Sequence, residues 1–222
     1  SCCDAANTSL DSESFDHIVS QFGLEYAGTP ALTEMARLLR TGGTLTALMH
    51  LRDGAIDREC AADKAAISEV LDSGLFPALV HLFKVSLARR RGQGSRVGFE
   101  LADKALNPPV QIVRGVLNKH GKTLANGLLH RIYADIAHMY KNMKAFDPDE
   151  VIAWSDKVEG ELQTFSKRLE SMSAAALDEV TMTQHIALLT EHGLVISAPD
   201  TLSLGEAKEP AAWIVKGHKP AA

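Results

Sequence analysis

The fold is decided by two neighbouring stretches, SFDHIVSQFG (residues 14–23) and TPALTEMARLLRTGGTLTALMHL (residues 29–51). The first contains an apolar run from Phe15 to Phe22 that is rich in β-forming residues and predicts a buried strand. In the second, Thr29-Pro30 is typical of a helix start, and Gly42-Gly43 predicts the end of that helix. An apolar strand from Leu45 to Leu51 follows. Strand, helix and strand with short connections predict a right-handed crossover and a parallel sheet covered on both faces.

The middle of the chain has a helical pattern. No convincing strand occurs between about Asp57 and Ala176, and Asp147 to Glu150 combines a cap, a first-turn proline and a capping-box glutamate. Pro108-Pro109 predicts that one helix ends and another begins there. Arg89 to Arg91 could contact phosphate, but their place before Gly92 favours stabilisation of a helix C-terminus. Apolar residues from Val158 to Met172 alternate in steps of four and three, which predicts a seam for a neighbouring helix.

The C-terminal part returns to mixed structure. We expect a helix with a capping box at Thr181 and Gln184, a strand at 194–196, a long hairpin connection over 199–210 and a last strand over 211–216. The sequence therefore predicts an α/β core formed by residues 1–56 and 177–222, with residues 57–176 as a helical insertion or cap.

The composition is that of an ordinary globular chain. The 222 residues are 45% apolar and 23% charged, and Lys+Arg 23 against Asp+Glu 28 gives a net charge of −5. This mild acidity gives no pull toward nucleic acid or an anionic membrane. Neither a run of roughly 20 apolar residues nor a secretion signal is present. We expect a cytoplasmic protein that binds neither nucleic acid nor membrane.

The metal-binding and thiol residues do not form a recognisable site. We expect Cys2 and Cys3 to end a buried strand as small apolar residues, because the pair lacks the spacing of a zinc site. His130, Asp135 and His138 favour a solvated helix face, since complete ligand pairs are lacking. The sequence therefore predicts no metal.

Several motifs, matched in order, resemble class I S-adenosylmethionine-dependent methyltransferases. They are Asp4-Ala5, Ser14-Phe15-Asp16 with the apolar run after it, Glu34-Met35-Ala36-Arg37 leading to Gly42-Gly43, His192-Gly193-Leu194-Val195, and Trp213-Ile214-Val215-Lys216. The resemblance begins at the end of the family's third strand and leaves the helical middle unmatched. It implies a partial Rossmann-like methyltransferase sheet of α/β class with a large helical insertion.

The resemblance also implies a cofactor site for S-adenosylmethionine. Asp4 would accept a hydrogen bond from the adenine amino group, with the backbone N–H of Ala5 beside it. Ser20, Gln21 and Phe22 would leave the fourth strand of the family's sheet at its carboxyl end and face the methionine end of the cofactor. Two alternatives remain open, that Asp4 is a turn residue and that Phe22 packs in the core.

The chain departs from the family in two places. Thr41 stands where the family usually has proline, which is a mild change in a turn. The glycine-rich loop and the acidic residue that holds the ribose are absent, so one wall of the cofactor site is missing. The strand from Phe15 to Ser20 would then be an exposed apolar edge. We therefore expect the C-terminal part of a longer methyltransferase, or a chain that an upstream segment or a partner chain completes.

The expected activity is methyl transfer to a small-molecule acceptor, because the sequence has no basic surface signal. Positioning alone can supply much of the acceleration, and His50, at the end of the second predicted strand, is the best-placed base. A partly exposed His50 without a role is the alternative. The helical insertion would lie over the carboxyl ends of the strands as a lid. The rival hypothesis is a non-catalytic helical interaction protein on a methyltransferase-remnant scaffold, in which the seam from Val158 to Met172 recruits a partner.

Overall fold

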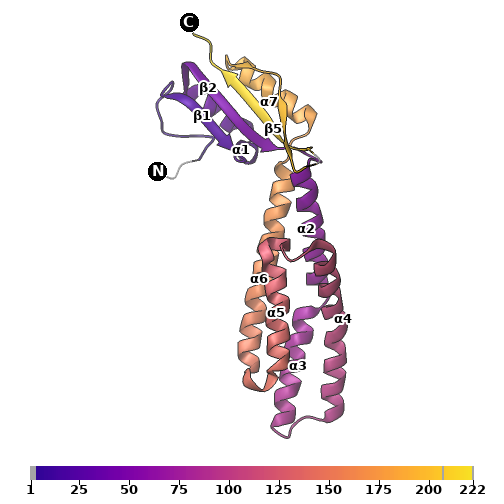
Figure 1. The fold of residues 1–222 in the computed structure, drawn as a ribbon. Helices are drawn as coiled ribbons and strands as arrows, with labels where there is room; N and C mark the ends of the chain where they lie inside the picture. The colour runs from indigo at the N-terminus through magenta and orange to yellow at the C-terminus, as the bar shows by residue number, and fades with distance from the viewer. Residues whose placement is uncertain (1–3, 207, 222) are drawn as a thin grey trace. The chain divides into compact units, whose positions relative to one another are not determined.

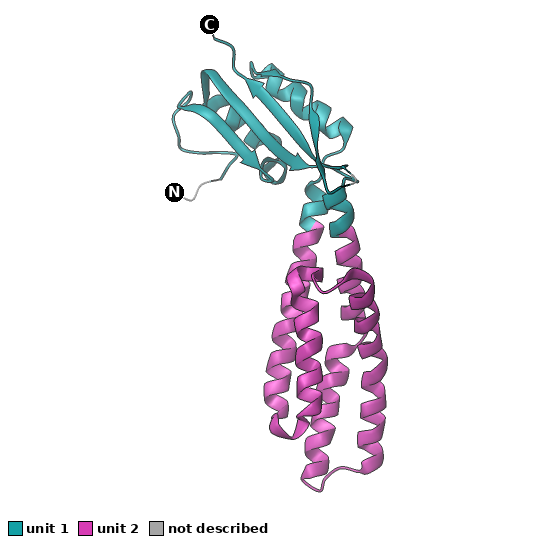
Figure 2. Ribbon diagram, in the orientation of Figure 1, with its two compact units in different colours: residues 1–60, 171–222 teal, residues 61–170 magenta. Residues whose placement is uncertain are grey.

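The computed structural model describes residues 4–206 and 208–221. The chain divides into two compact units, shown in Figure 2. One unit, here called the sheet unit, consists of residues 1–60 and 171–222, and the other, the helical unit, consists of residues 61–170. The boundaries predicted from the sequence lie at 56/57 and 176/177. Cys2 and Cys3, expected at a strand end, lie outside the described residues.

The sheet unit is built on a mixed five-stranded sheet (Figure 1). Strand β1 (Phe15–Gln21) pairs in parallel with β2 (Leu39–His50), and β2 pairs antiparallel with β5 (Glu209–His218). Strands β3 (Val195–Ile196) and β4 (Asp200–Leu204) both pair antiparallel with β5. The predicted strand, helix and parallel strand are confirmed, but the last strand of the chain runs in the opposite direction to its neighbour. The fold class is therefore mixed α/β with a mixed sheet.

Helices cover one face of this sheet. Helices α1 (Leu24–Leu38) and α7 (Glu179–Glu191) pack against each other and against this face, where a hydrogen bond of 3.1 Å joins Thr33 Oγ1 and His192 Nε2. Between the helices and the sheet lies a core that includes Leu32, Met35, Leu39, Leu45, Ala47, Met49, Met182, Leu189, Trp213 and Val215. Alternate residues of β2, such as Thr44 and Thr46, are exposed or half-buried on the other face. The expectation of a sheet covered on both faces is therefore wrong for the described residues.

Strand β1 is an edge of the sheet. It pairs only with β2 in the described part of the chain, and the side chain of Val19 is 75% exposed. The strand itself is confirmed, but the prediction that it is buried is wrong. A row of unpaired backbone groups with an apolar side chain is a template for another strand.

The connection between α1 and β2 differs from the sequence expectation. The helix ends at Leu38, so Gly42 and Gly43 lie inside β2 and not at the helix end. The register between β1 and β2 shifts at this point, from the pair Phe15↔Leu39 to the pair His17↔Thr44. Gly42 lies within the irregular stretch of β2 and has a φ of 78°. Gly43 is needed for a different reason, since a Cβ at this position would lie 2.9 Å from the carbonyl oxygen of Asp16.

Two expectations for the C-terminal part are also corrected. Part of the predicted connection over 199–210 is strand β4, because its backbone completes hydrogen bonds along the free side of β5. The cap of α7 is Asp178, whose Oδ1 accepts a hydrogen bond of 2.8 Å from the backbone N–H of Thr181, rather than a box formed by Thr181 and Gln184.

The chain leaves the sheet after β2 and returns to it at one small joint. Leu51 and Leu177 form a parallel bridge, and the backbone N–H of Leu177 donates to the carbonyl oxygen of His50 over 2.8 Å. The carbonyl oxygen of Leu177 accepts from the backbone N–H of Arg52 at 3.0 Å and from Trp213 Nε1 at 2.8 Å. These bonds hold the outgoing and the returning backbone side by side, as part of the sheet unit.

Helices make up the excursion between those points. They are α2 (Ala55–Asp72), α3 (Leu75–Arg90), α4 (Arg96–His120), α5 (Leu128–Lys141) and α6 (Pro148–Ala175), with 3₁₀ turns η1 (Leu124–Gly127) and η2 (Met143–Ala145). The predicted cap of α6 is confirmed, since the backbone N–H of Asp149 donates to Asp147 Oδ1 over 2.9 Å and that of Asp147 donates to Glu150 Oε2 over 3.4 Å.

Helix α4 contradicts the predicted break at Pro108-Pro109 and runs through both prolines. The carbonyls that lose their donors belong to Lys104 and Ala105, two exposed residues whose backbone water can reach. On the other side of the helix, a buried face continues past the prolines to Val113. Packing of that face therefore outweighs the lost bonds.

Residues 55–90 contain a window long and apolar enough to meet the composition criteria for a membrane span, with a mean hydropathy of 1.4. This window is 39% buried in the structure, and Leu75, Leu79 and Leu82 are fully buried. The core helices of a globular unit meet the same criteria, so the expectation of no membrane association stays a prediction.

Candidate functional site

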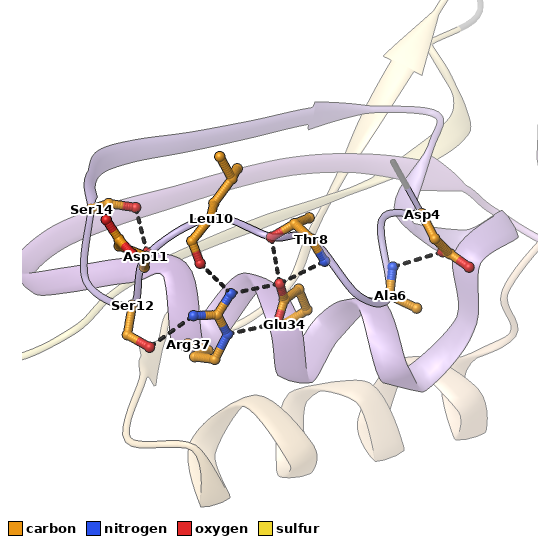
Figure 3. Close-up of polar contacts among 9 residues, drawn as sticks. All are labelled: Asp4, Ala6, Thr8, Leu10, Asp11, Ser12, Ser14, Glu34 and Arg37. Carbon is orange, nitrogen blue, oxygen red and sulfur yellow. Dashed lines mark hydrogen bonds and ion pairs between the residues drawn. The ribbon is translucent and has the colours of Figure 1, made fainter. Parts of the chain in front are cut away.

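Two residues of α1, Glu34 and Arg37, fix the segment that precedes β1 (Figure 3). Glu34 Oε1 accepts the backbone N–H of Thr8 at 2.9 Å and also the hydroxyl of Thr8. The guanidinium of Arg37 donates to Ser12 Oγ and to the carbonyl oxygen of Leu10, each at 2.8 Å. Both residues belong to the motif that resembles the methyltransferase family, and the structure gives them a shared task. They hold the segment of residues 4–14 against α1.

The pair is joined directly, and this joint is electrostatically strong. Arg37 Nε and Nη2 both lie 2.7 Å from the carboxylate of Glu34, one on each oxygen. The hydrogen bond from Arg37, followed by that from Thr8, lowers the pKa of Glu34 to about 2. Glu34 therefore remains a carboxylate well below neutral pH.

Asp4 lies in a tight turn at the start of this segment. Its Oδ1 accepts the backbone N–H of Ala6 at 2.9 Å, and its carbonyl oxygen accepts that of Asn7 at 3.1 Å. The turn is the alternative that the sequence left open, and it is present. The side chain is exposed and oriented by the turn, so a role in the turn and a role toward a ligand are compatible.

A groove lies between this segment, β1 and α1. It has a volume of about 490 Å³, and Ala5, Ser20, Gly23 and Leu24 are among the residues that line it. The structure therefore brings together two of the predicted cofactor residues, Ala5 and Ser20, which come from separate segments. Gln21 is exposed and, as the next residue along the strand, points to the opposite face of the sheet.

The other predicted residues gather at the carboxyl ends of β1 and β2. The rings of Phe22 and His50 lie with their centroids 4.4 Å apart, and Tyr26 meets His50 edge-on at 5.9 Å. His50 is only 4% exposed, which overturns the alternative of a partly exposed histidine. Phe22 has a φ of 53°, a left-handed conformation that is uncommon for a bulky residue and that brings it next to His50.

Glu25 is the residue that sequence reasoning missed. Its Oε1 lies 2.6 Å from His50 Nδ1 and accepts the backbone N–H of His50 at 3.2 Å. Its other oxygen, Oε2, is buried without a hydrogen-bond partner among the described residues. The pKa of the neighbouring Tyr26 is raised by burial, then by the charge of Glu25. An acidic residue in the first turn of a helix gives no signal of such a pairing, because it is favourable there for other reasons.

A carboxylate on Nδ1 has a defined chemical effect on an imidazole. It fixes the ring orientation and keeps the proton on Nδ1, so that Nε2 is the nitrogen able to accept a proton. In the described part of the chain, no group of three or more histidine, cysteine or acidic residues is placed to hold a metal ion. The arrangement can therefore bind and orient a ligand and accept a proton at His50.

The fold and these contacts define an α/β protein whose polar and aromatic residues meet where two parallel strands end. Residues 1–47 match the family described as methyltransferase domain, and this match supports a class I S-adenosylmethionine-dependent methyltransferase domain. No curated protein and no solved structure matches the chain. The matched residues include the segment held by Glu34 and Arg37, strand β1 and most of β2.

Proposed function

We propose that this protein transfers a methyl group from S-adenosylmethionine to a small-molecule acceptor, on a Rossmann-like core. The observation that carries the proposal is the convergence of the family match on residues 1–47 with an aromatic cluster at the ends of β1 and β2 and with a groove that runs between β1 and α1 and reaches Ser20 near the end of β1. In open α/β sheets, ligands bind outside the carboxyl ends of the strands, which is where the aromatic cluster and the Ser20 end of the groove lie.

The residues present fit one side of the cofactor. Asp4 and Ala5 would hold the adenine end, since the turn leaves a carboxylate exposed beside the groove that Ala5 and Ser20 line. Phe22 would pack toward the methionine end. When bound, S-adenosylmethionine supplies an electrophilic methyl group on sulfur.

A groove open on the side of β1 supports the further proposal that an upstream segment or a partner chain completes the sheet and the second wall of the site.

On the acceptor side, His50 is the residue proposed to take up a proton. Glu25 orients its ring, and Phe22 and Tyr26 exclude water from its faces. A positioned base of this kind contributes about 10²–10⁴-fold to a rate. The net charge of −5 supports an acceptor other than nucleic acid. We also propose that the helical unit acts as a lid that selects the substrate. The proposal further includes a cytoplasmic location without membrane contact.

The experiment is a titration of the isotope-labelled chain with S-adenosylhomocysteine, followed by amide NMR. We expect weak binding, with shifts at Ala5, Ala6 and Ser20. Asp4→Ala should weaken these shifts, whereas Asp11→Ala, a matched change of an exposed acid in the same segment, should leave them unchanged. No shift in the sheet unit at millimolar ligand would reject the cofactor site and favour the non-catalytic interaction protein.

A further inference from the structure

A basic groove lies in the helical unit, remote in sequence from the residues of the proposed site. It is lined by the cationic side chains of Arg89, Arg90, Lys141 and Lys144, with Ser86, Phe99, Tyr140 and Met143 among the other residues, and has a volume of about 840 Å³. The cations come from the end of α3, the end of α5 and the 3₁₀ turn η2. Tertiary structure thus extends the basic run of the sequence into a cluster of four.

This cluster has no acidic counterpart. In the described part of the chain, none of the four cations forms an ion pair with a carboxylate, and no acidic residue lines the groove. Two acids of α4 have other partners, because Glu100 pairs with Arg96 and Asp103 accepts the hydroxyl of Tyr140 at 2.7 Å. In a protein with a net charge of −5, four uncompensated cations in one groove are an unbalanced local charge.

These cations make contacts that the stabilisation of a helix end does not require. Arg89 stacks on the ring of Phe99 at 5.4 Å, and Arg90 Nη1 donates to the carbonyl oxygen of Lys144 at 2.9 Å. Lys144 lies in η2, after the end of α5. Two of the guanidinium groups are therefore held in position by neighbours that leave their charge unneutralised.

A second, apolar pocket shares a wall with this groove. It has a volume of about 340 Å³. Its lining from α4 and α5 is mainly apolar, with Leu106, Val110, Ile136 and Ala137, and it also includes the polar residues Asp103, Asn107 and Tyr133. Tyr140 borders both cavities. Its hydroxyl is held by Asp103, so its ring has a fixed place between them. A charged cavity next to an apolar one matches a ligand with an anionic head and an apolar body.

We propose that the helical unit binds a small amphipathic organic anion, with its carboxylate or phosphate head among Arg89, Arg90, Lys141 and Lys144 and its apolar body in the pocket between α4 and α5. Arginine suits this role because its planar guanidinium can form two parallel hydrogen bonds to such a head group. This site is independent of the proposed methyl transfer.

The test uses the full chain and monomeric dodecyl phosphate, with dodecanol as the uncharged probe, in calorimetric titrations at low and high salt. We expect dodecyl phosphate to bind at least tenfold more tightly than dodecanol, and to weaken as salt screens the exposed cations. Arg89→Gln combined with Lys141→Gln should reduce its affinity about tenfold. The matched control is Arg114→Gln with Lys119→Gln on α4, of which Lys119 lies about 30 Å along the helix from Phe99. This control should leave the affinity unchanged.

A second variant tests the apolar part. Ala137→Trp should fill the pocket between α4 and α5 and reduce dodecyl phosphate binding, while circular dichroism checks that the helical unit remains folded. Equal binding of dodecanol and dodecyl phosphate, or equal losses in the groove variant and its control, would overturn the proposal. So would binding to vesicles of anionic lipid without binding to the monomeric probe, because the partner would then be a membrane surface.

Discussion

Replacement of His50 by alanine should destabilise the sheet unit strongly, because this change removes the side-chain partner of a fully buried carboxylate. The side chain of Glu25 is 0% exposed, and Oε1 would keep only the backbone N–H of His50, at 3.2 Å. Its Oε2 has no partner among the described residues even in the intact protein. Breaking a buried pair by removing one member costs about 3–5 kcal/mol. That is a large share of the roughly 5–15 kcal/mol by which native domains are stable.

The two tryptophans allow the sheet unit to be measured by itself. Trp213 lies in β5, whereas Trp154 lies in α6 within the helical unit. In a Trp154→Phe background, fluorescence during urea unfolding reports on the sheet unit alone. This separation matters because a chain of two units need not unfold in one transition. The free energy of unfolding then comes from the midpoint and slope of that transition.

Three further variants, Glu25→Gln, Glu25→Ala and a double variant, decide whether the loss comes from the pair. Glu25→Gln keeps an acceptor for the imidazole N–H and should cost only about 1 kcal/mol. The double variant His50→Ala with Glu25→Ala should be more stable than the sum of the single effects by about 1–3 kcal/mol. A loss below about 0.5 kcal/mol for His50→Ala, the size typical of surface positions, would refute the buried pair.

Three other outcomes are expected. Because the pKa of Glu34 is about 2 in the folded protein and 4.5 in the unfolded chain, its stabilisation of residues 4–14 should be complete above pH 4.5 and be lost as the pH falls toward 2. Amide hydrogen exchange of that segment measures this loss, and Glu34→Gln should abolish the pH dependence. Phe83→Ala should cost the helical unit about 3–5 kcal/mol through a cavity, as read by Trp154 fluorescence, while the unfolding of the sheet unit stays unchanged. Val19→Lys should reduce self-association in light scattering and change stability by less than about 0.5 kcal/mol, since the side chain is exposed on an edge strand.

Periodicity and caps predicted the local elements well wherever one signal dominated. The strand, helix and strand from Phe15 to His50 and the cap at Asp147 are of this kind, because neighbouring residues alone determine them. The expectations that were wrong depended on distant partners. Gly42-Gly43 lies inside a strand because Lys219, just beyond the end of β5, accepts a hydrogen bond from the backbone N–H of Gly42 and donates one to the carbonyl oxygen of Gly43. Pro108-Pro109 lies inside a helix because a buried face continues past it.

In the candidate site, too, features set by neighbouring residues were predicted and features set by distant partners were not. His50 could be placed at a strand end from its sequence position, but nothing in the pattern indicated that Glu25 would bury beside it. The acid and the base of the motif in α1, Glu34 and Arg37, were recognised as a signature, but their contacts with residues 4–14 depend on how that segment folds back over the helix. Roles that arise from such long-range contacts are not encoded in spacing. The part played by His50 in catalysis stays a prediction.

The joint between Leu51 and Leu177 has a consequence for the history of this protein. The backbone is held on both sides of it by hydrogen bonds from Leu177, Arg52 and Trp213, all of which belong to the sheet unit. The backbone that leaves the sheet unit at Leu51 and the backbone that returns to it at Leu177 are already adjacent. A short turn could therefore join them without disturbing a strand. The whole excursion could then have been gained in one genetic step, and genes for shortened forms could still encode a sheet that folds.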